Sequence, residues 1–419
     1  MNCRHCNKPL THVFIDLGHQ PLSNSFLDKD QLSAPEEVYP LKVLTCSECF
    51  LVQVDEHKNA SEIFNHGYVY YSSYSSSWLD HARRYTEMVV DRFGLGGSSV
   101  VVEIASNDGY LLQYMKERDI PCYGIEPSSA TAMAAWEKGI ESVTEFFSEE
   151  LAARLARERG RAALIVGNNV LAHVPNINDF VRGISLLLDD NGVATLEFPH
   201  LMRLVDDCQF DTIYHEHFSY LSLRTVQRIF SEQGLCVFDV EELPTHGGSL
   251  RVFVRHDAND SKGISPRIGA LLVKEKCAGM TTLHYYTAIQ AKADIIRDNL
   301  LSFLEAKRVN GKRVAAYGAA AKGNTLLNYC GVGVELIEYC VDASPHKQGL
   351  FMPGSRIPVL APTELYRQKP DYVLILPWNI KDEVVSQHSY IREWGGRFVT
   401  AIPRLLVDGE HQVGRSRHP

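Results

Sequence analysis

The sequence predicts an α/β protein with a small cysteine-containing module at its N-terminus and two open, mostly parallel sheets behind it. The first observation is an irregular segment, residues 1 to about 60, which contains two C-x-x-C pairs. The second is an alternation of short apolar strands and helices between about residues 65 and 256. The third is the return of that alternation in the C-terminal third. Strands that alternate with helices are typical of parallel α/β sheets.

Size and composition narrow the classes of protein. A chain of 419 residues is long enough for two or three domains. A net charge of -9 argues against a general nucleic-acid binder, which needs a basic face. No apolar run approaches the roughly 20 residues of a membrane-spanning helix, and the first residues contain no apolar signal segment. We therefore expect a cytoplasmic protein without nucleic-acid or membrane partners, as a monomer or weak homodimer.

The N-terminal cysteines form the pattern C-x2-C…C-x2-C. Two thiolates three residues apart can hold one ion from a tight turn, and two such turns complete a tetrahedral site. Because four cysteines leave no open coordination position, we expect a structural zinc ion rather than a catalytic one. The predicted ligands are Cys3, Cys6, Cys46 and Cys49.

The first strand of the central region runs into a small polar loop, "VVEIASNDGYLL". The loop contains one glycine, so it matches the dinucleotide fingerprint G-x-G-x-x-G poorly, and a pyrophosphate is not its obvious ligand. Acidic groups in place of a phosphate cradle favour a cationic cofactor such as S-adenosylmethionine over NAD. The predicted cofactor-binding residues of this loop are Glu103, Ala105, Asn107, Asp108 and Gly109.

Polar residues also follow the next two strands. Glu126 and Pro127 end the second strand in "GIEPS", where a carboxylate can accept the ribose hydroxyls of an adenosine cofactor. The third strand ends in "NNVLAHVPN", which brings Asn168, Asn169 and His173 to the carboxyl edge of the sheet, where ligands bind. The ordered set predicts a methyltransferase domain, although each element alone could be a loop that merely turns polar.

The stretch "YHEHFSY", Tyr214–Tyr220, is the densest group of ionisable residues in the chain. A metal site is one interpretation, with His215 and His217 as ligands and His173 or His246 as a further one. A polar loop satisfied inside a core is another. We favour acid/base chemistry, because a histidine accepts a proton near neutral pH and a carboxylate can fix its tautomer.

The C-terminal unit repeats the strand, small-residue loop and helix in "AAYGAAAKGNT". The amides at the helix start can hold a phosphate, Lys322 could supply charge, and Asn324 is the other predicted substrate-binding residue. Asp342 ends the next strand, about where a ribose acceptor would be. A domain that only packs is the alternative.

Taken in order, these motifs resemble the sugar C-methyltransferases of deoxysugar biosynthesis, which methylate a nucleotide-linked 4-keto-6-deoxyhexose. The resemblance spans almost the whole chain and includes "LGHQPLSNSFL", "YVYYSSYS", "FDTIYHEHFSYLS" and "HGGSLRVF". It implies a zinc-binding domain over residues 1–65, a Rossmann-like S-adenosylmethionine domain over 66–260 and a helical connection with a Rossmann-like domain over 261–419. The family binds its sugar nucleotide, here expected to be a dTDP sugar, between the last two domains.

The resemblance also implies a mechanism. His217 would remove the proton alpha to the 4-keto group, and Tyr214 and Glu216 would orient the base and the sugar. His173 would lie near the developing enolate, whose stabilisation is the main electrostatic task. The carbanion would then attack the methyl group of S-adenosylmethionine in line.

Several residues follow from the resemblance with less detail. One tyrosine of "YVYYSSYS" should line the pocket, and Tyr68 is preferred over Tyr70 and Tyr71. His215 and His246 are expected on the substrate side. The methylated carbon, C3 or C5, stays open.

Two other functions compete with this one. The C-terminal unit could be an NAD-dependent sugar-nucleotide dehydrogenase within a bimodular protein, although its loop lacks a three-glycine fingerprint. The chain could also be a non-catalytic binding protein that contacts a partner through its zinc module. One departure from the family pattern is His200 in "LEFPHL", where relatives often carry an aromatic residue, which could alter sugar selectivity.

Overall fold

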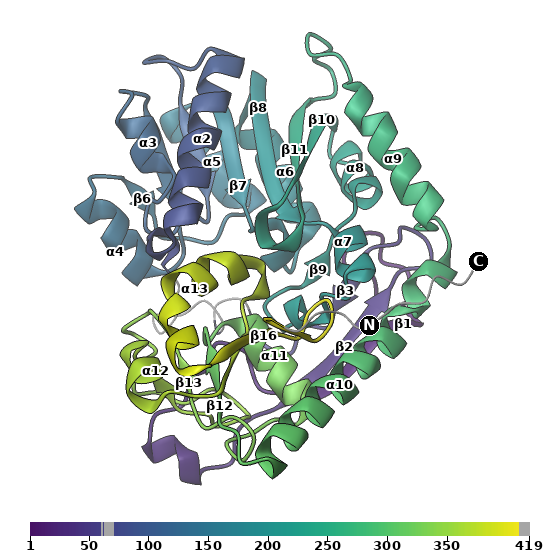
Figure 1. Cartoon of the computed structure of the whole chain (residues 1–419). Coiled ribbons are helices and arrows are strands. Elements are labelled where there is room, and N and C mark those ends of the chain that lie inside the picture. The colour runs from purple at the N-terminus through teal and green to yellow at the C-terminus, as the bar shows by residue number, and fades with distance from the viewer. Residues whose placement is uncertain (60–61, 63–70, 410–419) are drawn as a thin grey trace. The chain divides into compact units, whose positions relative to one another are not determined.

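The computed structural model describes residues 1–59, 62 and 71–409 (Figure 1). The chain forms two compact units. Unit 1 comprises Met1–Phe14, Val43–Arg203 and Glu216–Thr287, and unit 2 comprises Ile15–Lys42, Leu204–His215 and Ala288–Pro419. Each unit is therefore assembled from segments that are distant in sequence.

Unit 1 contains a seven-stranded sheet in the order β10-β11-β8-β7-β4-β5-β6 (Figure 1). The five strands from β8 to β6 are parallel, while β10 and β11 pair with each other, and β11 with β8, in antiparallel register. The strands are β4 (Val101–Ile104), β5 (Cys122–Ile125), β6 (Ser142–Val143), β7 (Ala162–Asn168), β8 (Leu188–Pro199), β10 (Leu235–Leu243) and β11 (Ser249–His256).

Helices cover both faces of this sheet because successive strand residues point to opposite sides. Val101 packs in one core cluster with Tyr85, whereas its neighbour Val102 packs in another with Phe180. Serine or asparagine side chains cap α2, α5, α6, α8 and α9. The helices are α2 (Ser76–Phe93), α3 (Leu112–Lys116), α4 (Ser129–Glu137), α5 (Glu149–Arg159), α6 (Ile177–Leu187), α7 (Leu201–Asp206), α8 (Leu223–Ser231) and α9 (Pro266–Ala278).

A second sheet follows the order β1-β2-β3-β9. Its strands are β1 (His12–Gln20), β2 (Tyr39–Thr45), β3 (Val52–Val54) and β9 (Ser219–Tyr220). Strand β3 comes directly after the second cysteine pair, and β9 comes directly after "YHEHF". Their antiparallel pairing, with Val52 opposite Tyr220, therefore joins the N-terminal module to the histidine motif.

Unit 2 contains a six-stranded sheet in the order β14-β13-β12-β15-β16-β17, parallel except for β17. Its strands are β12 (Val314–Tyr317), β13 (Cys340–Val341), β14 (Val359–Leu360), β15 (Tyr372–Ile375), β16 (Arg397–Thr400) and β17 (Leu406–Val407). Its helices are α10 (Ile289–Val309), α11 (Ala321–Cys330), α12 (Thr363–Gln368) and α13 (Lys381–Gln387). The predicted α/β class with two mostly parallel sheets is confirmed.

None of the helices in the described part of the chain has the length and hydropathy needed to cross a membrane.

Candidate active site

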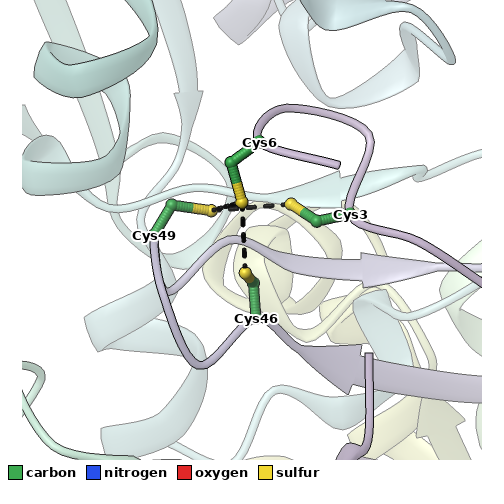
Figure 2. A group of neighbouring side chains, drawn as sticks. All are labelled: Cys3, Cys6, Cys46 and Cys49. Atoms are coloured by element: carbon green, nitrogen blue, oxygen red, sulfur yellow. Dashed lines mark hydrogen bonds between the residues drawn. The ribbon is translucent and has the colours of Figure 1, made fainter. Parts of the chain in front are cut away.

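The four predicted metal ligands lie together, with all their sulfur atoms within 4.8 Å of one another (Figure 2). Two Sγ–Sγ distances, Cys3 to Cys49 and Cys6 to Cys46, are 3.5 Å, and the distance from Cys6 to Cys49 is 3.7 Å. A tetrahedral zinc ion with Zn–S bonds of about 2.3 Å requires sulfurs about 3.8 Å apart. The cluster fits a structural zinc site.

The backbone on the two sides of this cluster is nearly the same. The amide of Asn7 donates to the carbonyl of Cys3 at 2.9 Å, and the amide of Phe50 donates to that of Cys46 at 3.0 Å. Asn7 and Phe50 both have φ 59°, the left-handed conformation that closes each turn. Each C-x-x-C pair is thus held in a tight turn by main-chain bonds.

The polar loop after β4 is held by the carboxylate of Glu126. This carboxylate accepts the amide N–H of Asn107 and that of Ser128, both at 2.9 Å. The loop contains three positive φ angles, 58° at Ala105, 50° at Asn107 and 74° at Gly109. The resulting curvature places main-chain amides and acidic side chains at the carboxyl end of the strand, where the sequence predicted a cofactor.

The acidic side chains of this loop suit a cationic ligand, because a nearby cation would favour the ionised form that burial disfavours. Burial raises the pKa of Glu103 well above its ordinary value and also raises the pKa of Glu126. The Nζ of Lys138 donates to the carbonyl of Asp108 at 2.7 Å. In the described part of the chain, Asp108 Oδ1 and Asn168 Oδ1 are buried without a hydrogen-bond partner. Buried acceptors require donors, and the ammonium and ribose hydroxyl groups of S-adenosylmethionine are such donors.

Two predicted histidines are neighbours in unit 1. The ring centroids of His173 and His217 are 4.5 Å apart at an interplanar angle of 70°. The Nδ1–H of His173 donates to the carbonyl of Glu216 at 2.9 Å, and Glu216 is itself buried. Burial lowers the pKa of His173 to about 4, so its ring is neutral at pH 7 and presents Nε2 as an acceptor.

The "YHEH" motif crosses the division between the two units. Tyr214 and His215 end a segment of unit 2, and Glu216 and His217 begin a segment of unit 1. His215 lies 3.2 Å, from Nε2, from the carbonyl of Pro40 in unit 2. The two histidines of the motif thus belong to different surroundings, whereas the alternation of a regular extended segment predicts that residues two apart share one side.

The tyrosines of "YVYYSSYS" are only partly described. Tyr68 and Tyr70 lie outside the described residues. The amide of Ser72 donates to Asn107 Oδ1 at 2.9 Å, and Tyr71 is the preceding residue. The end of this segment is therefore fastened to the cofactor loop.

His246 also belongs to this edge of the sheet. Its Nε2 lies 2.9 Å from Asn169 Nδ2, and its φ of 54° shows the bend of the turn in which it sits. The preceding residue, Thr245, donates its hydroxyl to Glu197 Oε1 at 2.8 Å. The main-chain carbonyl of Glu197 accepts the amide of Asn169 at 2.7 Å. Glu197 in β8 therefore bonds both to Asn169 and to Thr245, the residue before His246.

Glu197 and its partners were missed by the sequence reasoning. Glu197 is fully buried, and its Oε2 accepts Arg251 at 2.7 Å and His81 at 2.9 Å. These bonds lower the pKa of Glu197 to about 2 against the opposing effect of burial. The sequence did contain an indication of these contacts: a glutamate lies inside the apolar strand "VATLEF", and a buried charge needs a partner.

His200 is directed to α9. It is buried, and its Nε2 lies 2.9 Å from Glu275 Oε1. The same carboxylate accepts the amides of Leu223 and Arg224 at the start of α8, at 2.7 and 3.1 Å. His200 and Glu275 thus help to connect α9 with the start of α8.

The predicted substrate residues of unit 2 lie in the first turn of α11. Lys322 donates to Asn379 Oδ1 at 2.7 Å, and its Nζ lies 4.6 Å from the ring centroid of Trp378. Asn324 is buried and donates to a main-chain carbonyl at 2.6 Å. Asp211, fully buried, accepts the indole N–H of Trp378 at 2.7 Å. Lys322 thus already has partners of its own.

Fold and site together define a methyltransferase domain joined to a zinc-binding domain, and comparison with known families agrees. Residues 3–64 match a zinc binding domain model, 78–240 match a methyltransferase domain, and 244–403 match a C-methyltransferase C-terminal domain. The chain is 33% identical to the C-methyltransferase NovU of Streptomyces niveus over 97% of its own length and 96% of that protein. The chain belongs to this C-methyltransferase family, and S-adenosylmethionine is the cofactor of its central domain.

Two solved structures are similar to part of the chain. The magnesium protoporphyrin IX methyltransferase of Synechocystis PCC 6803 with bound SAM covers 42% of this chain and 78% of its own at 14% identity, with a TM-score of 0.34. The PH0226 protein of Pyrococcus horikoshii OT3 covers 45% and 94% at 11% identity, with a TM-score of 0.37.

Proposed function

We propose that the protein transfers a methyl group from S-adenosylmethionine to a carbon alpha to the keto group of a nucleotide-linked 4-keto-6-deoxysugar, with a dTDP sugar as the first candidate. The observation that carries this proposal is the pair of His173 and the buried His217, whose ring centroids are 4.5 Å apart in the same unit as the cofactor loop. Carbon methylation beside a ketone needs a base, and this pair supplies one.

His217 is the proposed base. It removes the alpha proton, and the electron pair of the broken C–H bond becomes the enolate. The enolate carbon would take the methyl group as the bond between methyl and sulfur breaks and S-adenosylhomocysteine leaves. Because His173 is neutral at pH 7, His217 can take up this proton without a second positive charge beside it. S-adenosylmethionine, when bound, supplies the electrophilic methyl group.

His173 has a narrower task in this proposal. Its Nδ1–H is given to the carbonyl of Glu216, so the neutral ring has no second N–H for an enolate oxygen. We assign it to orienting His217. Tyr214 and Glu216 orient the base and the sugar, and His246 and His215 face the substrate side.

The test is incubation with a panel of nucleotide-linked 4-keto sugars and labelled S-adenosylmethionine, with mass spectrometry and NMR to locate the methyl group. In deuterated solvent without the methyl donor, the wild type should exchange the alpha proton, and His217→Asn should lower that rate by at least 100-fold. His256→Asn is the matched control, because His256 belongs to the same unit and its Nε2 lies 3.2 Å from the carbonyl of Leu188 at the start of β8; it should retain most of the exchange. Wild-type exchange by His217→Asn would contradict the assignment of the base.

The dehydrogenase alternative predicts a different ligand. Stabilisation of the protein by NADH and not by S-adenosylhomocysteine in a thermal-shift experiment would favour it. The non-catalytic alternative predicts neither methyl transfer nor alpha-proton exchange with any sugar of the panel.

A further inference from the structure

Arg4 lies inside the first C-x-x-C turn, between two of the metal ligands. Its amide donates to Gln53 Oε1 at 2.9 Å, and Gln53 Nε2 in turn donates to Cys3 Sγ at 3.3 Å. Gln53 is fully buried in β3. The main chain of Arg4 is therefore fixed to both the metal cluster and the strand that follows the second cysteine pair.

The side chain of Arg4 leaves the metal cluster and reaches both histidine segments. One guanidinium nitrogen donates to the carbonyl of Pro175 at 3.0 Å, two residues after His173. The other donates to the carbonyl of Val54 at 2.5 Å, and the guanidinium carbon lies 5.3 Å from the ring centroid of Phe218. Phe218 directly follows His217.

Main-chain bonds complete this connection. The amide of Val54 donates to the carbonyl of Phe218 at 3.2 Å, next to the pairing of β3 with β9. His5, the next residue of the turn, exchanges two hydrogen bonds with Asn178 in α6, at 2.9 and 2.8 Å. The zinc turn thus contacts the chain on the C-terminal side of each histidine.

The chemistry of arginine suits this task. Its planar guanidinium donates in two fixed directions and can also lie over an aromatic ring, whereas lysine offers only a point charge. A hydrogen bond from a charged group to a buried carbonyl contributes about 1.5–3 kcal/mol. Misplacement of catalytic groups by about 1 Å can cost about 100-fold in rate.

We propose that Arg4 is a positioning residue through which the zinc-binding domain sets the relative position of His173 and His217. This inference rests on the proposed function, because it takes those two histidines as the orienting residue and the base. It gives the metal a role in catalysis without any contact between metal and substrate.

The test compares Arg4→Gln with Arg228→Gln. Arg228 donates to the carbonyl of Glu48 in the second C-x-x-C turn at 3.1 Å, and among the described residues its side chain forms hydrogen bonds and ion pairs with Glu48 and Glu232 and not with either histidine segment, so it is a matched control. Hydrogen–deuterium exchange of the protein backbone is measured by mass spectrometry over peptides covering residues 171–178 and 216–221. Zinc content, affinity for S-adenosylhomocysteine and the alpha-proton exchange rate are measured in parallel.

Arg4→Gln should keep wild-type zinc content and cofactor affinity, exchange faster in both peptides and lose about 10- to 100-fold in alpha-proton exchange. Arg4→Lys should fall between it and the wild type, and Arg228→Gln should match the wild type. Loss of zinc from both Arg4 variants would assign the residue to the metal turn alone and overturn the proposal, as would unchanged peptides. If no sugar reacts with the wild type, the proposed function fails, and the peptide exchange still decides whether Arg4 fixes the two segments.

Discussion

Glu126 in unit 1 and Asp342 in unit 2 end the second strands of their sheets with the same main-chain device. Each carboxylate accepts one amide from the loop after the first strand and one amide from the serine two residues further on. The donors are Asn107 and Ser128 for Glu126, both at 2.9 Å, and Ala319 and Ser344 for Asp342, at 2.7 and 2.8 Å. The two loops therefore share a backbone solution.

The loops differ in charge. The loop of unit 1 lies beside the buried acids Glu103 and Asp108. Each loop also accepts a lysine at a main-chain carbonyl, Lys138 at that of Asp108 at 2.7 Å and Lys347 at that of Ala319 at 2.8 Å. Unit 2 has a further lysine, Lys322, in the first turn of the following helix. The two units therefore share the backbone conformation of this loop and differ in the charged side chains around it. The acids of unit 1 suit a cationic cofactor, and we propose that the lysines of unit 2 bind an anionic group.

The largest expected effect comes from closing the bend of the first loop. Gly109 has φ +74°, and an added Cβ would lie 2.5 Å from Ile140 Cδ1. A left-handed alanine costs roughly 1–2 kcal/mol, and overpacking adds roughly 1–3 kcal/mol. The loop should shift in Gly109→Ala, and the Kd for S-adenosylhomocysteine, measured by calorimetry, should rise by about 100-fold.

The matched change is Gly318→Ala, since Gly318 has φ +85° and its Cβ would lie 2.5 Å from Pro377. It should leave the affinity for S-adenosylhomocysteine within about twofold of the wild type. An equal loss in both variants would break the assignment of the cofactor to unit 1.

The fold was largely predictable because strand and helix alternation is a local pattern. The segment "SSVVVEIAS" is a strand whatever its partners, and the order of such strands indicates a parallel sheet. The composition of the two units was not predictable in this way. Strand β9 has only two residues, and its place beside β3 depends on hydrogen bonds between segments more than 160 residues apart.

The second expected effect tests the carboxylates themselves. In Glu126→Gln an amide NH₂ replaces one of two oxygens that both accept backbone N–H groups, so one donor would face another. An unsatisfied buried donor costs about 1–3 kcal/mol. The Kd for S-adenosylhomocysteine should rise by at least tenfold.

Asp342→Asn makes the same chemical change in unit 2 and should leave this affinity unchanged. If Asp342→Asn weakened cofactor binding as much as Glu126→Gln, the two loops could not serve different ligands.

For the candidate site, the sequence predicts residue types but not the contacts between them. The residues "YHEH" and "NNVLAH" indicate polar groups at the edge of the sheet, because buried strands rarely end in such clusters. Which nitrogen of His173 carries the proton follows only from the carbonyl of Glu216, 43 residues away. Likewise, the sequence alone indicates that Arg4 is an exposed loop residue. Its contacts with the two histidine segments follow only from the carbonyl groups that accept its hydrogen bonds.

The third effect is a pH dependence of opposite sign in the two units. Burial lowers the pKa of His173 to about 4 from 6.5, so between these values the unfolded state binds more protons and stability falls as the pH falls. Burial raises the pKa of Asp211 to about 6 from 3.8, so there the folded state binds more protons and stability rises as the pH falls. Each slope approaches about 1.4 kcal/mol per pH unit.

Urea unfolding of the wild type, His173→Gln and Asp211→Asn between these pKa values measures both slopes. Relative to the wild type, His173→Gln should gain stability as the pH falls, and Asp211→Asn should lose it. A variant that keeps the wild-type pH dependence would show that its residue titrates as it does in the unfolded chain.

The smallest effect concerns the anionic ligand of unit 2. Lys322 already interacts with Asn379, Trp378 and the nearby Asp211, and these interactions would weaken its attraction for a phosphate. Lys322→Met should therefore raise the Kd for a nucleoside diphosphate by only about five- to tenfold, about 1 kcal/mol. The affinity for S-adenosylhomocysteine should not change.

Lys312→Met is the control, because Lys312 is an exposed residue of the same unit that pairs with Asp371 at 2.9 Å. Calorimetry with dTDP and with S-adenosylhomocysteine separates the two ligands for each variant. Loss of stability in Lys322→Met without loss of dTDP affinity would make Lys322 a packing residue. The resemblance between the two loops would then be one of backbone alone, with a ligand in unit 1 and none at the start of α11.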